Sequence, residues 1–480
     1  MLLSFLGFLL AFTLIGISSA RLSRGTRHDY YLATGSVKPW LVGLSAVATN
    51  NSGYMFIGVI GYTYTTGFPA FWLMIGWILG DLIGSRFVHQ RLRAATTRTG
   101  EVSYAGVLAN WYGAGNGTVQ RVIGSLSLLF LLAYAAAQLV AGSKALHVLF
   151  GWPQSAGAIL GAVIVVAYCL AGGIRASIWT DAAQSIVMIL AMALLLVTAL
   201  ADLGGIESTY SAMQAIPDFT SWFPRDLLLP GLAGALLFII GWMFAGLSVI
   251  GQPHVMVRFM TLDSAAHMRR ARLWYYLWYI SFYTLATGVG LVARIFLHET
   301  ATFDAELALP TMALELLPPV LVGLVLAGIF AATMSTADSL VLSCSAALTH
   351  DLWPQNIEST RLIKLSTLAV TVVALAIALS NNQSVFSLVI LSWSGLASAF
   401  APLLMALCLG RNPTQGVTLA AMFAGLGTAL LWRWAGWHIH VYEGLPGILL
   451  GVTILVAASS GYRPVASVEK SANHHQRVSG

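Results

Sequence analysis

Five side chains that carry hydroxyl or carboxyl oxygens lie within Ala331–Ser339, a segment that is otherwise apolar. A polar group inside a bilayer is costly unless it is paired, faces a water-filled cavity or holds an ion. On a helix, Ser335, Asp338 and Ser339 stand at positions i, i+3 and i+4 and therefore share one face. Hard cations prefer oxygen ligands, so this face is a candidate cation site.

A second source of oxygen atoms is the run Ala48–Gly53, because its Asn, Ser and Gly residues disfavour a regular helix. The carbonyls of an intact helix are occupied, whereas unwound backbone that lines a cavity can offer them to an ion. We therefore expect this run and the helix that carries Ser335 and Thr336 to meet at mid-bilayer and hold sodium. The alternative for the two hydroxyls is a hydrogen bond to a carbonyl one turn earlier in their own helix.

Two further acids lie in apolar surroundings. Asp181 stands near the start of an apolar span, where it could cap that helix or pair with Arg175. Asp81 could be an interfacial acid or an interior partner for a cation, and the sequence leaves both interpretations open.

Three residues are candidates for solute contacts. Tyr134 and Gln138 are one helical turn apart, and Trp242 lies beside a second helix break. Aromatic rings at a midplane cavity would stack on an apolar part of a solute, while an amide offers both a donor and an acceptor. Packing or a place at the membrane interface is the alternative for the aromatic residues.

The composition indicates a polytopic membrane protein. The chain has 480 residues, of which 58% are hydrophobic and 9% charged, against roughly 25% charged in an average soluble domain. About thirteen apolar runs approach the ~20 residues that cross a bilayer. They are Leu2–Ala20, Trp40–Tyr64, Phe71–Val88, Ile123–Val148, Ala156–Ala171, Trp179–Leu200, Leu229–Ile250, Leu273–Phe296, Val320–Ser345, Leu365–Leu379, Val385–Leu409, Val417–Trp434 and Ile448–Ser460.

Charge order sets the expected orientation. No Lys or Arg precedes the first apolar run, whereas Arg21 and Arg24 follow it, so we expect a retained helix and not a cleaved signal. Lys and Arg gather in alternate connections between the apolar runs, and we expect Arg258 to Arg272 to lie in one of these connections. Asp and Glu gather in the other connections. By the positive-inside rule the N-terminus is expected outside and the tail, residues 466–480, in the cytoplasm. The net charge of +6 therefore reflects topology, and no nucleic-acid partner is expected.

The second break, Gly251-Gln252-Pro253, lies five spans after the first. Interrupted spans at matching places indicate the midplane site of an inverted-repeat transporter. We expect one transmembrane domain, residues 1–465, with repeats at about 40–202 and 228–410, one helix before them and two after. The alternative is that these glycines serve close helix packing.

Several motifs together resemble those of the sodium/solute symporters, and most closely the sodium/proline symporter branch. The motifs are Asp29-Tyr30-Tyr31-Leu32-Ala33, Ala48–Gly53, Gly172-Gly173 with Trp179-Thr180-Asp181, Gly251-Gln252-Pro253-His254 with Arg258-Phe259-Met260, and Met334-Ser335-Thr336. The resemblance implies an all-α, leucine-transporter-like core of two inverted five-helix repeats. It also implies transport of a small organic solute together with sodium.

The resemblance further implies site residues. The main sodium would be held by the carbonyls of Ala48 and Asn51 together with Ala332, Ser335 and Thr336. A second cation position would take Ser335, Asp338, Ser339 and Asp181, and solute contacts would involve Tyr134, Asn50, Ser52, Gly53 and the residues before Pro253. The chain departs from the proline branch at Asn50, which replaces an acid, and at Ala245 and Val249, which replace aromatic residues, so we expect a differently shaped cavity.

These observations predict a sodium-coupled symporter of the plasma (inner) membrane that contacts lipid and imports proline or a related amino acid. The alternatives are a sodium symporter for a small carboxylate or another solute, a transporter-like solute sensor, and proton coupling through Asp181 or Asp338. The patterns HExxH, GxSxG and GxxxxGK[ST] are missing from the sequence. We therefore expect no enzymatic activity, with an ion gradient as the source of energy.

Overall fold

The computed structural model describes residues 1–113, 115–297, 303–353, 357–380 and 385–459, which are almost entirely helical. The helices are α1 (Leu2–Ser18), α2 (Arg27–Leu32), α3 (Pro39–Asn50), α4 (Ile60–Thr66), α5 (Pro69–Thr99), α6 (Tyr104–Ala109), α7 (Gly117–Phe150), α8 (Gln154–Asp202), α9 (Ile206–Gln214), α10 (Gly231–Leu247), α11 (Pro253–Met260), α12 (Met268–Phe296), α13 (Ala308–Leu316), α14 (Pro319–Ala346), α15 (Thr360–Ser380), α16 (Val385–Cys408), α17 (Gln415–Trp434) and α18 (Gly444–Ala458). Short 3₁₀ or π turns are η1 (Ser19–Leu22), η2 (Ala33–Gly35), η3 (Met55–Val59), η4 (Ser248–Gly251), η5 (Ala265–His267), η6 (Ala305–Leu307), η7 (Ala347–Leu352) and η8 (Trp437–Ile439). Within the described ranges, β pairing is limited to a bridge between Val37 and Leu262.

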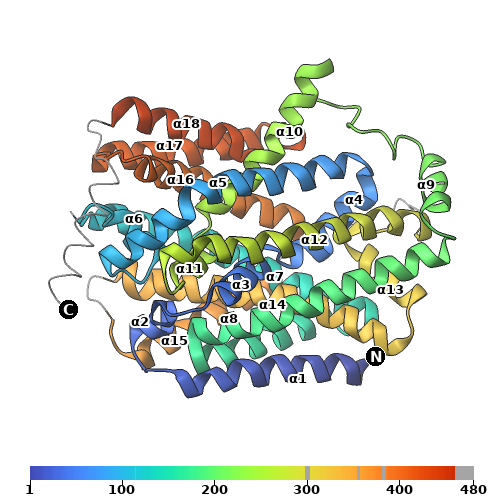
Figure 1. The fold of residues 1–480 in the computed structure, drawn as a ribbon, viewed down its shortest axis with the longest axis horizontal. Helices are drawn as coiled ribbons and strands as arrows, with labels where there is room; N and C mark the ends of the chain where they lie inside the picture. The colour runs from blue at the N-terminus through green and yellow to red at the C-terminus, as the bar shows by residue number, and fades with distance from the viewer. Residues whose placement is uncertain (114, 298–302, 354–356, 381–384, 460–480) are drawn as a thin grey trace.

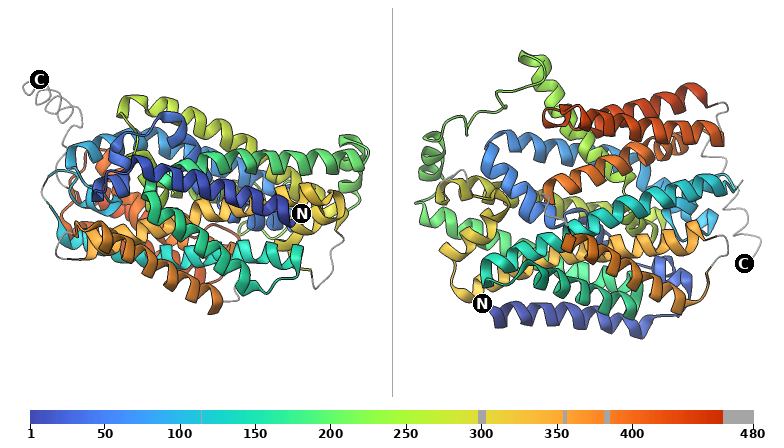
Figure 2. Two further views of the ribbon diagram at one scale, coloured as in Figure 1. Left: turned by 90° about the horizontal axis from the view of Figure 1, so that it is seen from below. Right: turned by 180° about the vertical axis from the view of Figure 1, so that it is seen from behind.

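The long helices run side by side, with α1 at one edge and the pair α17 and α18 at the opposite edge (Figures 1 and 2). Ten of the described helices are long and apolar enough to cross a membrane. In α14 and α16, 83% of the most apolar window is buried, against 28% in α1, so these two helices lie at the centre. Helix α14 packs mainly against α7 and α8, and its polar residues are therefore surrounded by protein and not by lipid.

The predicted first break is confirmed. Helix α3 begins at Pro39, whose missing N–H is of no consequence in a first turn. It ends at Asn50, and the Asn51 side chain donates to the carbonyl of Val47 at 2.9 Å. Asn51 and Ser52 are not helical, and helical geometry resumes at Gly53 ahead of η3 and α4, so a short break separates α3 from α4.

The second break is also confirmed. Helix α10 tightens into η4, Gln252 is extended with φ −97° and ψ 104°, and α11 begins at Pro253. Proline has no N–H to donate and clashes with a preceding helical turn, so it cannot continue α10 but can start α11.

Helix α8 is 49 residues long, or about 73 Å at 1.5 Å per residue, far longer than a bilayer core of about 30 Å. Gly173 interrupts it with φ 56° and ψ −139°. A Cβ atom on Gly173 would lie 2.5 Å from the carbonyl oxygen of Tyr30, so a side chain is excluded there. This break separates the two predicted spans Ala156–Ala171 and Trp179–Leu200.

The predicted number of thirteen crossings is not established by the ten qualifying helices. The limits of the two repeats, residues 40–202 and 228–410, stay a prediction. The predicted cytoplasmic tail, residues 466–480, lies outside the described residues.

Candidate ion and solute site

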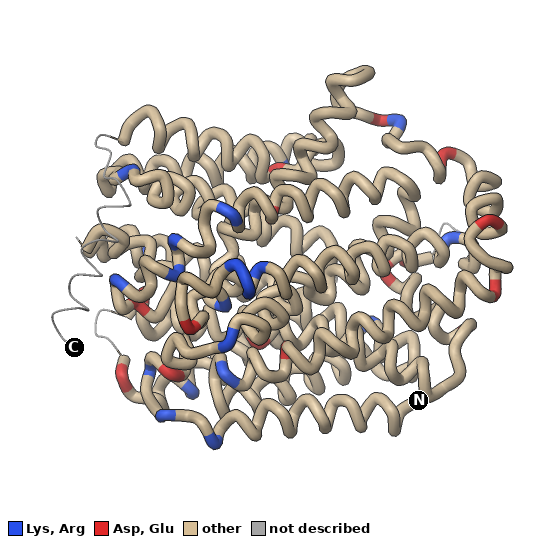
Figure 3. Tube along the Cα trace, in the orientation of Figure 1, with Lys and Arg blue, Asp and Glu red and all other residues tan. Residues whose placement is uncertain are grey.

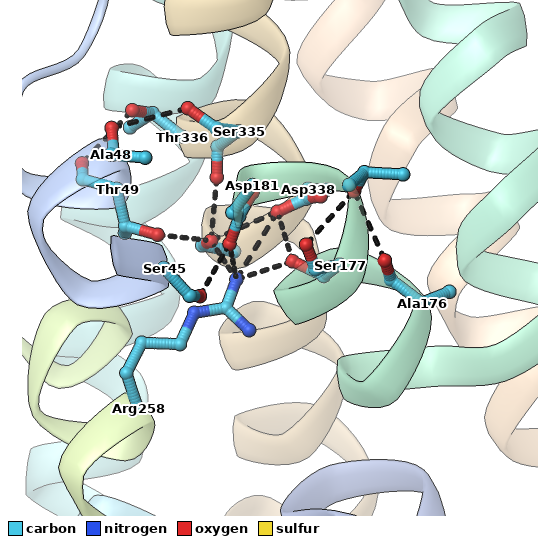
Figure 4. A network of polar contacts seen from close by, with 12 residues as sticks. Ser45, Ala48, Thr49, Ala176, Ser177, Asp181, Arg258, Ser335, Thr336 and Asp338 are labelled. Carbon is cyan, nitrogen blue, oxygen red and sulfur yellow. Dashed lines mark hydrogen bonds and ion pairs between the residues drawn. The ribbon is translucent and has the colours of Figure 1, made fainter. Parts of the chain in front are cut away.

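The end of α3 meets the middle of α14, as the sequence predicts. The hydroxyl of Ser335 lies 3.1 Å from the carbonyl oxygens of both Ala48 and Ala332. The hydroxyl of Thr336 donates to the carbonyl of Thr49 at 2.9 Å (Figure 4). All five residues are buried. Four of them are residues that we predicted for the main sodium position, and they converge in the fold.

One detail of this cluster differs from the prediction. Thr49, whose carbonyl faces α14, was not singled out, although its place beside Ala48 in the unwound run is the signal for it. The described hydrogen bonds of Asn51 run from its side chain and its N–H to the Val47 carbonyl, and the role of its own carbonyl stays a prediction. Carbonyl and hydroxyl oxygens from both elements converge at one buried spot, which is the ligand chemistry that a hard cation takes.

A second polar network surrounds the guanidinium group of Arg258 on α11. Its Nη2 atom lies 3.3 Å from Asp338 Oδ1 and 3.5 Å from Asp181 Oδ2, and none of these side chains is exposed. The hydroxyl of Ser177 donates to Asp338 at 2.7 Å, and that of Ser45 donates to Asp181 at 2.6 Å. Figure 4 shows the guanidinium pointing between the two carboxyl groups. Asp181, Asp338 and Arg258 thus form one buried ionic cluster.

Two interpretations from the sequence are wrong here. Arg258 was assigned to a cytoplasmic connection, but it is fully buried within α11. Arg175 was considered as a partner of Asp181, but it pairs with Asp29 at 2.7 Å. A buried arginine needs compensating carboxylates, and these come from α8 and α14, which local sequence patterns cannot bring together.

The ionic cluster is not fully satisfied. Asp181 Oδ1 and Asp338 Oδ2 have no hydrogen-bond partner. Two carboxyl groups also face a single arginine, so the cluster carries excess negative charge when both acids are ionised. Ser339, which contacts the guanidinium, lies 3.1 Å from the hydroxyl of Thr49. The cluster therefore adjoins the α3 end, and its vacant oxygens suit a further cation or a proton.

The predicted solute residues on α7 contact the unwound stretch after α3. The N–H of Gly53 donates to Gln138 Oε1 at 2.9 Å, and the hydroxyl of Tyr134 donates to that of Ser52 at 3.0 Å. A Cβ on Gly53 would lie 2.5 Å from Cγ2 of Thr333, so this backbone approaches α14 closely. Gln138 Nε2 has no partner, which leaves a donor available to a solute.

Of the predicted solute residues on α10 and η4, Trp242 lies apart from this group, whereas Ala245 connects to it through Trp393. Trp242 lines an outer cavity of about 300 Å³, and its ring centroid is 5.8 Å from that of Tyr62. Ala245 and Val249 are fully buried, and the carbonyl of Ala245 accepts from Trp393 at 3.0 Å. The structure therefore does not bring Trp242 to Tyr134 through any described ring contact.

Two aromatic neighbours of Tyr134 were missed. The ring centroid of His254, the residue after Pro253, lies 5.4 Å from that of Tyr134, and that of Trp393 lies 6.4 Å away. Both ring nitrogens of His254 are buried without partners. His254 ends the Gly251-Gln252-Pro253-His254 motif, which is a local signal for it, whereas Trp393 stands in an apolar run that offers none.

A model of the sodium:solute symporter family matches residues 30–425 of the chain. The chain belongs to the sodium:solute symporter family. A high-affinity proline transporter of Bacillus subtilis (strain 168) is 30% identical over 430 residues, which cover 87% of this chain and 89% of that protein. The sodium/proline symporter of Escherichia coli (strain K12) is 29% identical over 489 residues, covering 98% and 95% of the two chains.

Solved structures support the fold of this symporter. A Na⁺-coupled sialic acid symporter in a substrate-bound, outward-open state superposes with a TM-score of 0.80 at 19% identity, over 96% of this chain and 98% of the other. Mhp1, a nucleobase-cation-symport-1 family transporter with bromovinylhydantoin bound, gives a TM-score of 0.59 at 14% identity, over 89% and 93%. These similarities confirm the predicted leucine-transporter-like, all-helical fold.

Family membership confirms several predictions. The symporter is a multi-pass membrane protein that couples the movement of sodium to that of a small solute. It is a transporter and not an enzyme, as expected from the sequence.

Proposed function

We propose that this symporter imports proline or a closely related small amino acid together with sodium. The observation that carries the proposal is the contact of the Ala48 and Thr49 carbonyls with the Ser335 and Thr336 hydroxyls, next to the unwound stretch that faces Tyr134 and Gln138. Two relatives that span most of the chain are proline transporters. A small carboxylate or another solute is the second candidate, favoured by Ala245 and Val249 in place of aromatic residues.

Sodium would bind between α3 and α14. Its ligands would be the carbonyls of Ala48, Thr49 and Ala332 and the hydroxyls of Ser335 and Thr336. The stretch that continues into Ser52 and Gly53 carries the solute contacts, so an ion that fixes the end of α3 also orders the solute side. Such linkage is reciprocal, and the solute therefore tightens sodium binding by the same factor.

The Asp181 and Asp338 cluster is the candidate for a second cation. The vacant carboxyl oxygens and the excess of acids over arginine support it, together with the hydroxyl of Ser339. Arg258 already supplies one fixed positive charge there. Either sodium or a proton would complete the neutralisation, and sodium-free uptake driven by external acid would select the proton.

The solute side carries complementary unpaired groups. Gln138 Nε2 is a donor without a partner, suited to a carboxylate, and Asn50 Oδ1 is an acceptor without a partner, suited to an amine. The rings of Tyr134, His254 and Trp393 would cover an apolar body. A zwitterion with a small apolar ring or side chain fits this set.

The distribution of charge supports an orientation with the N-terminus outside. Lys and Arg gather at the end of the molecule that holds α2, α6 and the start of α12, whereas the end with α9 carries mostly Asp and Glu (Figure 3). By the positive-inside rule, this distribution favours α2 and α6 on the cytoplasmic side of the inner membrane. Helix α1 starts at the opposite end of the molecule (Figure 1), which supports an external N-terminus.

Uptake of labelled proline into proteoliposomes tests the proposal. An inward sodium gradient is expected to drive accumulation, and its replacement by a choline gradient is expected to abolish it. Ser335→Ala and Thr336→Ala are expected to weaken the sodium dependence. An uptake rate that does not depend on the sodium gradient would rule out sodium as the coupling ion. Competition by a panel of amino acids and carboxylates would show whether a solute other than proline is preferred. Solute binding without uptake would favour a sensor.

A further inference from the structure

Asp81 is a buried acid that the proposed transport site does not use. It lies on α5 with no part of its side chain exposed. Among the described residues, no Lys, Arg or His lies within ion-pair distance of it, and its Oδ1 atom has no hydrogen-bond partner. An acid in this position is costly and is a functional candidate by default.

A short chain of hydrogen bonds connects Asp81 to the end of α3. The hydroxyl of Tyr275, on α12, donates to Asp81 Oδ2 at 2.7 Å. The same hydroxyl accepts from Asn50 Nδ2 at 2.6 Å. The Asn50 amide and the Tyr275 hydroxyl both donate in the direction of the carboxyl group, so a negative charge on Asp81 polarises and strengthens both hydrogen bonds.

The chain of bonds lies in a tightly packed interface. A Cβ atom on Gly43 of α3 would lie 2.5 Å from the carbonyl oxygen of Ala271 on α12, so the two backbones are in direct contact. Tyr275 is fully buried, and its ring centroid is 5.5 Å from that of Tyr279. Little freedom is left for Tyr275, and a shift in its hydroxyl is transmitted to Asn50.

Asn50 directly follows the two residues whose carbonyls face α14. Ser335 and Thr336 contact the carbonyls of Ala48 and Thr49, and Tyr275 holds the side chain of Asn50. The end of α3 is therefore fixed by α14 and, independently, by α12 and α5. Loss of the second attachment frees the last residue of α3 and with it the direction of the adjacent carbonyls.

We propose that Asp81 is a positioning residue for sodium binding. Its carboxyl group acts through Tyr275 and Asn50 to hold the end of α3 in the conformation that presents the Ala48 and Thr49 carbonyls, and a cation bound there favours the ionised form of the acid. The negative charge also favours a cation at the neighbouring site. This inference rests on the proposed sodium site between α3 and α14.

Asp81→Asn is the matched variant, because it keeps the size of the side chain and an oxygen that accepts from Tyr275 but removes the charge. Sodium binding is measured as the sodium-dependent rise in thermal stability of the purified full-length protein without solute, at constant ionic strength. The half-saturating sodium concentration is expected to rise about tenfold, within the roughly 5- to 150-fold range of typical coupling between sites. The maximal uptake rate at saturating sodium and solute is expected to stay within about twofold of the wild type, which a general loss of structure would not allow.

Tyr275→Phe breaks the chain of bonds and keeps the carboxylate, so it should also raise the half-saturating sodium concentration. Tyr64→Phe is the control, because this equally buried hydroxyl donates to the Leu297 carbonyl at 2.8 Å and to neither Asn50 nor Asp81, and it should match the wild type. The double variant Asn50→Asp with Asp81→Asn returns a carboxylate to the chain of bonds and should recover most of the lost sodium affinity.

A half-saturating concentration that stays at the wild-type value in Asp81→Asn overturns the inference. If Asp81→Asn cannot be purified, Tyr275→Phe decides in the same way: a raised value supports the inference and an unchanged value overturns it. Equal effects of Tyr275→Phe and Tyr64→Phe also overturn it. A wild-type protein that sodium does not stabilise contradicts the proposed sodium site itself, which distinguishes the two failures.

Discussion

Replacement of Thr336 by valine probes the proposed sodium site with the least disturbance of packing. The side chain is fully buried, and valine keeps its β-branched shape. The change removes the hydroxyl that lies 2.9 Å from the carbonyl oxygen of Thr49. That carbonyl is near the end of α3, where the helix leaves its last C=O groups without intrahelical partners.

The magnitude follows from the loss of one oxygen. A polar contact to a charged group is worth about 1.5–3 kcal/mol, and about 1.4 kcal/mol corresponds to a tenfold change in affinity. The half-saturating sodium concentration should therefore rise roughly 10- to 150-fold. Without sodium, the unpaired Thr49 carbonyl should destabilise the α3–α14 contact by about 1–3 kcal/mol.

The assay is the initial rate of labelled proline uptake into proteoliposomes as sodium replaces choline at constant ionic strength. Thr371→Val on α15 is the matched control, because its described hydrogen bond is to the Thr367 carbonyl of its own helix at 2.9 Å and the side chain is likewise buried. Sodium dependence that is unchanged in Thr336→Val, or equally weakened in Thr371→Val, would refute the assignment.

Three other substitutions test the described geometry. Arg258→Gln leaves two buried acids without their cation and should lower the free energy of unfolding by about 3–5 kcal/mol. The expected result is a low yield of folded protein, part of which the additional change Asp338→Asn should recover. A normal yield from Arg258→Gln alone contradicts the ionic cluster. Gly53→Ala should abolish uptake, since its Cβ would lie 2.5 Å from Thr333 Cγ2. Thr333→Ser removes that methyl group and should restore part of the uptake in the double variant, while the remaining close contacts of 3.0 Å with Gln138 Oε1 and 3.1 Å with Ala141 Cβ keep it below the wild-type rate. Gly173→Ala should prevent stable folding, because φ is 56° and the Tyr30 carbonyl of α2 would lie 2.5 Å from the added Cβ. Size-exclusion profiles of the variant and the wild type provide the measurement.

The parts of the site that the sequence predicts are those with a local cause. The break at Ala48–Gly53 follows from its Asn, Ser and Gly residues, and the second break follows from Pro253. The hydroxyl face that includes Ser335 is visible from helical spacing alone. Their meeting could be inferred because oxygen atoms in a lipid environment must find partners.

The parts that the sequence does not predict depend on partners far along the chain. Arg258 resembles an ordinary cytoplasmic arginine until the fold brings Asp181 and Asp338 to it. Asp81 is ambiguous for the same reason, since its partner Tyr275 lies 194 residues away. Apolar periodicity reports which residues avoid water, but not which buried polar groups compensate one another.

The hydroxyl contacts between α3 and α14 have a consequence for the return of the empty carrier. A serine or threonine hydroxyl can donate its hydrogen to a carbonyl or, after turning about its C–O bond, present lone pairs to a cation. In the described conformation Ser335 and Thr336 donate. At the proposed sodium site, the same two side chains can therefore pair with the backbone carbonyls when no ion is bound and free them for a bound ion. The unloaded protein can then return to its starting conformation without leaving a buried carbonyl unpaired.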